Sequence, residues 1–205
     1  MYLKQSLSNI YWSVKECDER LSLLSSQLHN ISPILSKLIL LRNINEQDVG
    51  GFLNPHIIND MPDPFLLKDM DKSIDRVISS IKNKEKIGIF GDYDVDGSTS
   101  AAILFKFLSN FTNHIHILTP NRLSEGYGPN LRIMDEMIVK KINLIFTLDC
   151  GTSSNQIIDN KKYENIDVIV IDHHLSETVL PKVFSIINPN RFDENSNFDQ
   201  MAAVG

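Results

Sequence analysis

Three aspartates follow a short apolar stretch near the middle of the chain. Asp92, Asp94 and Asp96 come directly after Ile87–Phe90 and precede Gly97. The apolar stretch predicts a buried parallel strand, and if the backbone stays extended beyond it the three side chains turn in a similar direction. Carboxylates this close repel one another, which raises their pKa values unless a cation neutralises them. The stretch therefore predicts a site for a hard divalent cation.

Other interpretations of this stretch fit less well. An EF-hand calcium loop needs Glu at its twelfth position, where this chain has Ile103, and a helix before the loop. A P-loop needs Lys and then Ser or Thr, and no Lys follows Gly97. An acidic turn that only caps a helix from Ser98 explains one aspartate better than three. A nucleophile of the haloacid-dehalogenase type, Asp-x-Asp at a strand end, stays open on this stretch alone.

Two later apolar stretches also end in residues that can bind metal. Asn143–Leu148 precedes Asp149, and Asp167–Ile171 precedes an Asp-His-His sequence that starts at Asp172. Strands that alternate with helices at this spacing predict a parallel sheet with crossover helices. The ligand site of such a sheet lies outside the carboxyl ends of its strands. The predicted fold class is α/β, with the site at that edge.

Neighbouring strands would bring four of these side chains into one crevice. They are Asp94, Asp96, Asp149 and His173. Together they offer mixed carboxylate and imidazole ligands. Asp149 could bridge two ions about 3.5–4 Å apart. Such a pair of ions suits phosphoester hydrolysis, because one ion lowers the pKa of an attacking water and both hold the phosphate oxygens. The alternative is that His173 and His174 form a structural pair.

Prolines and helix-capping residues indicate the domain border and the remaining helices and strands. Residues 1–62 predict a small helical extension, with helices over Cys17–Leu28, from Pro33 after the N-cap Ser32, and near Asn45–Leu53. Residues 63–205 predict the α/β core, and the prolines around Met61–Pro64 mark the border. Further helices are expected over Phe65–Lys84, Ser98–Leu108, Asn130–Lys141 and Ser153 to about Lys161, and further strands over His114–Leu118 and Ser185–Ile187.

The charge balance limits how the protein could hold nucleic acid. The net charge is -6 and the pI is near 5.5, so any contact with nucleic acid is expected to involve a local surface and not the whole protein. The sequence has no apolar run of membrane-spanning length and no signal peptide, so no membrane association is expected and the cytoplasm is the expected compartment. Cys17 and Cys150 are in no metal-ligand spacing, and Cys150 is expected to pack in the core.

The loop over Pro120–Pro129 holds the other functional candidates, Arg122 and Glu125. Arg122 directly follows a predicted strand and precedes Gly126 and Gly128, whose lack of side chains permits close approach of a ligand. Its guanidinium could clamp two phosphate oxygens. The alternative is a structural ion pair with Glu125 or with a carboxylate at the sheet edge. His114 and His116 are expected to be a structural pair.

Taken in chain order, these motifs resemble the DHH phosphoesterase superfamily, and within it the exonucleases specific for single-stranded DNA. The resemblance covers nearly the whole chain, and its core motifs are Gly91–Ser100, Pro120–Gly128, Thr147–Ser153, Asp172–His174 and Ile187–Asn190. The Asp-His-His sequence removes the dehalogenase interpretation. Phe90 stands where inorganic pyrophosphatase relatives place a ligand His, and Asp94–Ser98 differs from the turn of the cyclic-dinucleotide phosphodiesterases.

The resemblance implies a role for each motif residue. It assigns metal binding to Asp94, Asp96, Asp149 and His173, and catalysis to His174, at the scissile phosphate, and to Asp92. It implies two Mn²⁺ or Mg²⁺ ions and hydrolysis of single-stranded DNA from the 5′ end in repair and recombination. It also implies a single-strand-binding protein and a helicase as partners.

The resemblance also sets an expectation for the end of the sequence. Met201–Gly205 looks like the start of a buried element, and in the superfamily another metal-binding Asp and further domains follow this position. We therefore expect an incomplete core and weak activity on single-stranded DNA. Two alternatives stay open: a phosphodiesterase of short oligonucleotides or cyclic dinucleotides, and a non-catalytic remnant that binds metal or a partner.

Overall fold

The computed structural model describes residues 4–5 and 7–205, and the chain divides into two compact units, Met1–Pro62 and Asp63–Gly205. Among the described residues, no helix has the length and apolar character needed to cross a membrane.

The first unit is mostly helical. Two short strands, β1 (Lys4–Gln5) and β2 (Tyr11–Trp12), pair antiparallel and precede α1 (Glu19–Leu28), α2 (Pro33–Leu41), the 3-10 turn η1 (Glu46–Asp48), α3 (Val49–Leu53) and α4 (Ile57–Asp60). Ser32 caps α2, because its hydroxyl accepts a hydrogen bond from the backbone N–H of Leu35. Helices α1 and α2 meet at small side chains, where the Ser36 hydroxyl donates to the backbone oxygen of Ser22.

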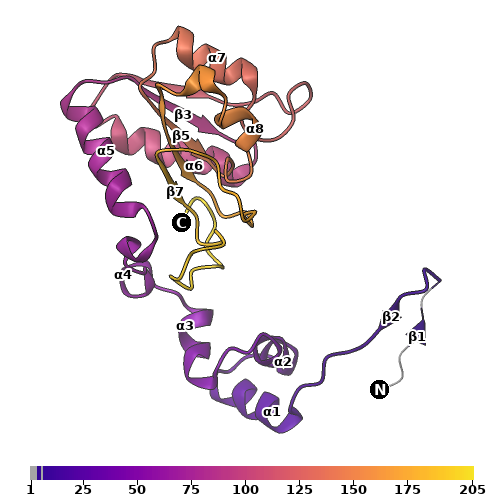
Figure 1. The fold of residues 1–205 in the computed structure, drawn as a ribbon. Helices are drawn as coiled ribbons and strands as arrows, with labels where there is room; N and C mark the ends of the chain where they lie inside the picture. The colour runs from indigo at the N-terminus through magenta and orange to yellow at the C-terminus, as the bar shows by residue number, and fades with distance from the viewer. Residues whose placement is uncertain (1–3, 6) are drawn as a thin grey trace. The chain divides into compact units, whose positions relative to one another are not determined.

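The second unit is built on a five-stranded parallel sheet with strand order β4-β3-β5-β6-β7 (Figure 1). The strands are β3 (Ile87–Gly91), β4 (Ile115–Leu118), β5 (Leu144–Leu148), β6 (Asp167–Ile171) and β7 (Ser185–Ile187). Every residue of β3 and of β5 is buried, as expected for central strands covered on both faces. The predicted α/β fold class is confirmed.

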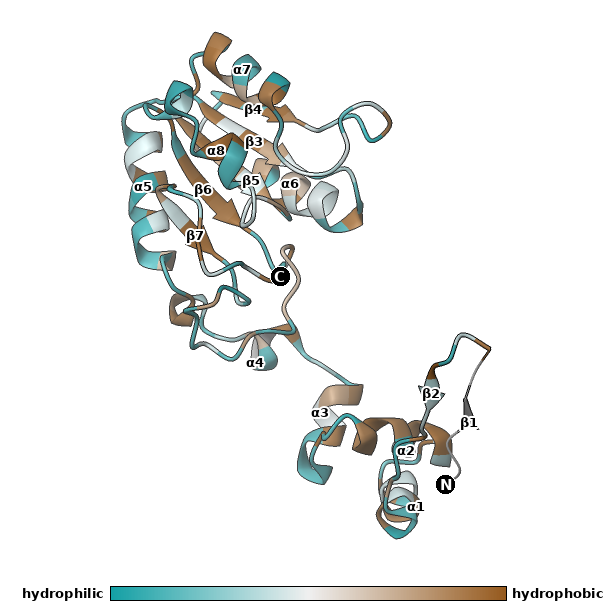
Figure 2. Ribbon diagram, turned by 45° about the vertical axis from the view of Figure 1, so that its right-hand side comes forward, coloured by the Kyte–Doolittle hydropathy of each residue, from teal (hydrophilic) through white to brown (hydrophobic). Residues whose placement is uncertain are grey.

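Helices cover both faces of this sheet. On one face α5 (Met70–Lys82) and α6 (Val95–Leu108) pack on a cluster that includes Ile89, Phe146 and Ile169. On the other face α7 (Leu131–Val139), α8 (Asn155–Ile158) and the 3-10 turn η3 (Lys161–Tyr163) pack on a cluster around Ile145 and Val170. Figure 2 shows hydrophobic strands β6 and β7 beside the hydrophilic outer side of α5.

In the second unit, three predicted helices differ from the structure by three residues or more at one end. Instead of one helix over Phe65–Lys84, a 3-10 turn η2 (Pro64–Leu66) precedes α5, which starts only after Asp69. Asp69 has a left-handed backbone with φ 62°, which interrupts the helix. Its carboxylate accepts from the N–H of Ile186 and from Arg191. Helix α6 starts at Val95, before the expected Ser98. The helix expected from Ser153 to Lys161 is reduced to α8, which ends at Ile158.

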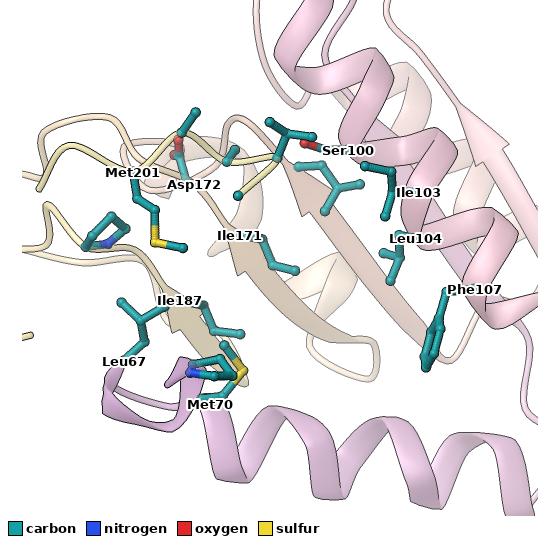
Figure 3. Close-up of a pocket in the computed structure, with 17 residues that line it drawn as sticks. Leu67, Met70, Ser100, Ile103, Leu104, Phe107, Ile171, Asp172, Ile187 and Met201 are labelled. Carbon is teal, nitrogen blue, oxygen red and sulfur yellow. The ribbon is translucent and has the colours of Figure 1, made fainter. Parts of the chain in front are cut away.

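An apolar pocket of about 330 Å³ lies between α6 and the start of α5 (Figure 3). Its lining includes Met70, Leu104, Ile171, Ile187 and Met201. Such a lining does not suit a phosphate group, which needs charged or hydrogen-bonding partners. Buried aspartates of this unit instead lie beyond the ends of β3, β5 and β6, at Asp92, Asp149 and Asp172.

Candidate metal centre

The order of the strands creates a switch point between β3 and β5. The chain leaves β3 to form β4 on one side, and later returns to place β5 on the other side of β3. In open parallel sheets, ligands bind outside the strand ends at such a point. Asp92–Asp96 follow β3, Asp149 follows β5, and His173 and His174 come soon after β6. The sheet therefore brings the predicted residues to one place.

The turn between β3 and α6 is held by its own backbone. Asp94 is the N-cap of α6, and its carboxylate accepts from the N–H of Gly97 at 2.9 Å. A Cβ atom at Gly97 would lie 2.6 Å from the backbone nitrogen of Asp92, so this tight turn requires glycine. Asp96 already belongs to the first helical turn. The backbone therefore does not stay extended through Asp96, because α6 starts at Val95 after its cap Asp94.

Asp149 is the most buried of the four predicted metal ligands. It is 1% exposed and has a left-handed backbone with φ 61°. Its Oδ1 lies 3.2 Å from Nε2 of His173. Burial, together with the nearby carboxylates of Asp94 and Asp96, raises the pKa of Asp149 to about 7.

The two histidines face different partners. Nε2 of His173 lies 3.5 Å from Oδ2 of Asp96, in addition to its approach to Asp149. Nδ1 of His174 lies 2.7 Å from Oδ1 of Asp172, a carboxylate that is 3% exposed. Burial lowers the pKa of His174, but the hydrogen bond and charge of Asp172 outweigh it and raise that pKa. A carboxylate of this kind fixes which ring nitrogen carries the proton.

Unpaired buried oxygen atoms test whether a cation fits here. Oδ2 of Asp92 and Oδ1 of Asp149 are buried and make no hydrogen bond. A buried carboxylate oxygen without a partner is costly unless a positive charge compensates it. One ligand atom each from Asp149, His173 and His174 lies within 4.8 Å of the other two. The donor set and its unpaired oxygens therefore fit a divalent cation.

Asp92 is as buried as Asp149 and contacts the loop over residues 120–129. It is 1% exposed, and its Oδ1 accepts from the N–H of Gly128 at 3.5 Å. Burial and the charge of Asp94 raise its pKa, while the N–H groups of Gly128 and Tyr93 act in the opposite direction. Asp92 thus connects the β3 turn to the loop over residues 120–129.

Sequence reasoning missed Tyr127 as a residue of this site. Its hydroxyl donates to the backbone oxygen of Asp149 at 2.5 Å and lies 3.1 Å from Nδ1 of His174. Its ring meets the His174 ring edge-on, with the centroids 5.6 Å apart. The sequence feature that could have indicated Tyr127 is its position between Gly126 and Gly128, in the Pro120–Pro129 loop that also holds Arg122 and Glu125.

Arg122 lies over an aromatic ring rather than beside Glu125. Its guanidinium carbon is 5.3 Å from the centroid of Tyr93, the residue between Asp92 and Asp94. Glu125 binds Arg132 instead, and this contact, with the N–H of Asn121, lowers the pKa of Glu125 to about 2. The structural alternative of an Arg122–Glu125 pair is therefore wrong.

Cys150 and His116 lie outside this chemistry. Cys150 is 1% exposed within the core cluster, and burial raises the pKa of its thiol. Burial also lowers the pKa of His116. Both observations agree with structural roles.

A parallel sheet with acids and an Asp-His-His turn at its switch point is the arrangement of a DHH phosphoesterase. The sequence model described as "DHH family, N-terminal domain" matches residues 86–204. The chain belongs to the DHH family, and the resemblance drawn from its motifs is confirmed.

Similar curated proteins include single-stranded-DNA-specific exonucleases named RecJ. The chain is 31% identical over 199 residues to the single-stranded-DNA-specific exonuclease RecJ of Bacillus subtilis, covering 97% of this chain and 25% of that protein. It is 34% identical over 140 residues to RecJ of Escherichia coli, covering 68% of this chain and 24% of that protein. The chain thus spans about a quarter of the length of these relatives.

Solved structures show the same likeness. An exonuclease RecJ bound to manganese matches with a TM-score of 0.60 and 27% identity, over 68% of this chain and 35% of that one. RecJ from Thermus thermophilus in complex with Mn²⁺ matches in fold with a TM-score of 0.61 and 20% identity, over 86% of this chain and 24% of that one.

Proposed function

We propose that this chain provides the metal-binding part of a RecJ-type exonuclease that hydrolyses single-stranded DNA from the 5′ end. The observation that carries the proposal is the meeting of Asp96, Asp149 and His173 at the switch point of the sheet. The likeness to RecJ exonucleases, including one bound to manganese, supports the same activity and metal. DNA repair and recombination, a cytoplasmic location, and single-strand-binding and helicase partners belong to this proposal.

In this proposal Asp94, Asp96, Asp149 and His173 hold two Mn²⁺ or Mg²⁺ ions. Bound ions would neutralise phosphate oxygens and lower the pKa of an attacking water. Asp149 comes from the central strand of the site, between the acids of β3 and the histidines of β6, which suits a bridging ligand. We assign these roles to the four side chains as a set, because their carboxylate and imidazole atoms match the preferences of such ions.

The remaining site residues act on the substrate in this proposal. His174 has a raised pKa and a ring held by Asp172, so it can carry a proton and donate a hydrogen bond to the scissile phosphate. Asp92, with one oxygen lacking a hydrogen-bond partner, contributes to the charge that orients the reacting groups. The net charge of -6 means that DNA must be gripped locally, near the ions.

Manganese titration combined with a degradation assay tests this function. The protein is given Mn²⁺ and a single strand labelled at its 3′ end, and we expect weak shortening that begins at the 5′ end. A duplex of the same sequence is the matched substrate control. Preferred cleavage of di- and trinucleotides or of cyclic dinucleotides would favour the other phosphodiesterase activity. Mn²⁺ binding without hydrolysis of any of them would favour a non-catalytic role of this chain.

We further propose that Arg122 binds a phosphate of the DNA near the ions and contributes to 5′ polarity. Its guanidinium is exposed and lies over Tyr93, directly beside the acids of the β3 turn. A planar guanidinium can bind two phosphate oxygens at once, which the ammonium of Lys cannot reproduce. Arg122→Lys is tested on strands with and without a 5′-phosphate. A loss confined to phosphorylated strands supports the role, and an equal small loss on both strands contradicts it.

A further inference from the structure

The segment that carries His173 and His174 has no regular secondary structure to hold it. Strand β6 ends at Ile171, and residues 172–177 belong to neither a helix nor a strand. A backbone of this kind must satisfy its N–H and C=O groups in another way. At the two histidines, these groups are held by side chains from outside the segment and by Asp172.

Asp172 holds the backbone N–H groups of both histidines. Its Oδ1 accepts from the N–H of His173 at 2.8 Å and from that of His174 at 3.2 Å. Its Oδ2 accepts from the N–H of Thr152 at 3.0 Å. This carboxylate also binds the His174 ring, so one group fixes both the backbone and the imidazole.

Two asparagines hold the backbone carbonyl groups of the same histidines. Nδ2 of Asn190 donates to the oxygen of His173 at 2.5 Å, and Nδ2 of Asn188 donates to the oxygen of His174 at 2.9 Å. Asn188 also donates to Oγ1 of Thr152 at 2.8 Å and is fully buried. These contacts close a ring through Asp172, Thr152, Asn188 and His174.

The turn that carries the asparagines is itself well fixed. The side-chain oxygen of Asn188 accepts from the backbone N–H of Asn190 at 2.7 Å, so the Asn188 amide also holds the backbone at Asn190. Arg191 donates to the backbone oxygen of Ile186 at 2.6 Å and to Asp69 at 3.0 Å, and its side chain is 10% exposed. The end of β7 is therefore rigid enough to locate the histidine segment.

We propose that Asn188 and Asn190 are positioning residues of the metal centre, which locate His173 and His174 by holding one backbone carbonyl group each. The inference rests on the proposed function, because the centre they serve is the one proposed there. Residues that orient metal ligands affect affinity without touching the metal. Neither asparagine is assigned to metal or substrate here.

The test compares Asn190→Ala and Asn188→Ala with a control at Asn155. Asn155 also donates from Nδ2 to a backbone oxygen, that of Val179 at 3.0 Å, which is five residues after His174 and belongs to neither histidine. Asn155→Ala therefore removes a similar bond from the same unit. Asn188 is buried, so if its variant does not fold, the partly exposed Asn190 carries the test.

Two measurements on the whole chain decide the outcome. The first is nitrogen NMR of the histidine rings in metal-free protein at alkaline pH, which reports the proton distribution between Nδ1 and Nε2. The second is Mn²⁺ affinity, measured by paramagnetic resonance of free Mn²⁺. We expect the asparagine variants to shift the ring signals and to weaken Mn²⁺ binding by about 10-fold, while Asn155→Ala does neither.

Other results would overturn the proposal. Unchanged ring signals and unchanged Mn²⁺ affinity in a folded asparagine variant would show that the bonds serve only the fold. Equal changes in Asn155→Ala would show that the effect is not specific to the histidines. If the unmodified protein binds no Mn²⁺, the proposed metal centre fails, and the ring signals alone still decide whether the asparagines position the histidines.

Discussion

The two sides of the candidate metal centre are held in different ways. On the β3 side, the cap of α6 is a bond between near neighbours, from the N–H of Gly97 to Asp94. Asp92 and Asp96 in the same turn also accept from more distant N–H groups, those of Gly128, Ala203 and Val204. On the β6 side, the histidine segment is fixed by bonds to Asn188 and Asn190, which lie 14 and 17 residues away from their partners. The β3 side thus contains a local capping motif at Asp94, whereas the carbonyl groups of the histidine segment depend on the turn after β7.

This difference separates the effects expected from substitutions. A change at Asp94 on the β3 side should alter a ligand and a helix cap and leave the rest of the fold intact. A change on the β6 side should alter the fold and the histidine geometry together, because the same bonds serve both. Asp149 lies between the two sides and touches residues of each.

The largest effect is expected at Asp149. Asp149→Asn should weaken Mn²⁺ binding by more than about 100-fold, since changes to residues that merely support ligands already cost 10- to 100-fold. Asn tolerates the left-handed backbone of this position, so the fold should be retained. Calorimetric titration measures the affinity. Asp135→Asn, on the exposed surface of α7, is the control, and an equal effect there would remove Asp149 from the centre.

The next effect is expected at Asp172, on the β6 side. Asp172→Asn should lower the free energy of unfolding by about 2–3 kcal/mol, because a buried ionised acceptor of several hydrogen bonds is replaced by a neutral group with misplaced donors. Urea unfolding followed by circular dichroism measures it. A loss below about 1 kcal/mol would mean that the β6 side does not depend on this carboxylate.

A smaller, pH-dependent effect is expected at Asp69, which supports the β7 end. Burial raises the pKa of Asp69, but hydrogen bonds from Ile186 and Arg191 outweigh it and hold that pKa below its ordinary value. The stabilisation is therefore complete above the ordinary carboxyl pKa and is lost as the pH falls through the lowered one. Asp69→Asn should cost about 1–2 kcal/mol at neutral pH.

Urea unfolding of Asp69→Asn and the unmodified protein, repeated in acid, tests that sign. The difference between the two proteins should shrink as the pH falls. A difference that stays constant would mean that Asp69 acts through its shape and not through its charge.

The smallest effect on stability is expected at Asp94, on the β3 side. Asp94→Ala should cost about 1 kcal/mol through loss of the N-cap of α6, whereas Asp94→Asn should cost little because Asn caps helices as well as Asp. Both variants should bind Mn²⁺ more weakly. Thermal unfolding and manganese titration of the pair separate capping from ligation, and equal stabilities would contradict the capping role.

The sequence predicted the strands well because their apolar character is local. The bounds predicted for Asp167–Ile171 and Ser185–Ile187 match β6 and β7. The helix expected from Phe65 failed because Asp69 binds Ile186, which is 117 residues away. Apolar periodicity contains no information about such a contact.

The same limit applies to the site. Strand ends and residue types pointed to Asp94, Asp96, Asp149 and His173, since each sits directly after a strand or in the turn that follows one. The supporting roles of Tyr127, Asn188 and Asn190 were not predicted, because each acts through a backbone oxygen of a residue at least 14 positions away. Type and spacing do not reveal bonds of this kind.

The left-handed backbone of Asp149 has a consequence for the unfolded chain. An aspartate rarely visits φ 61° when it is free to move, so folding selects an uncommon conformation at a cost of about 1–2 kcal/mol. Asp149→Gly would remove that strain but give the unfolded chain more conformations to lose. It would also remove the carboxylate. The residue that best suits the backbone here is therefore not the one that the proposed chemistry requires.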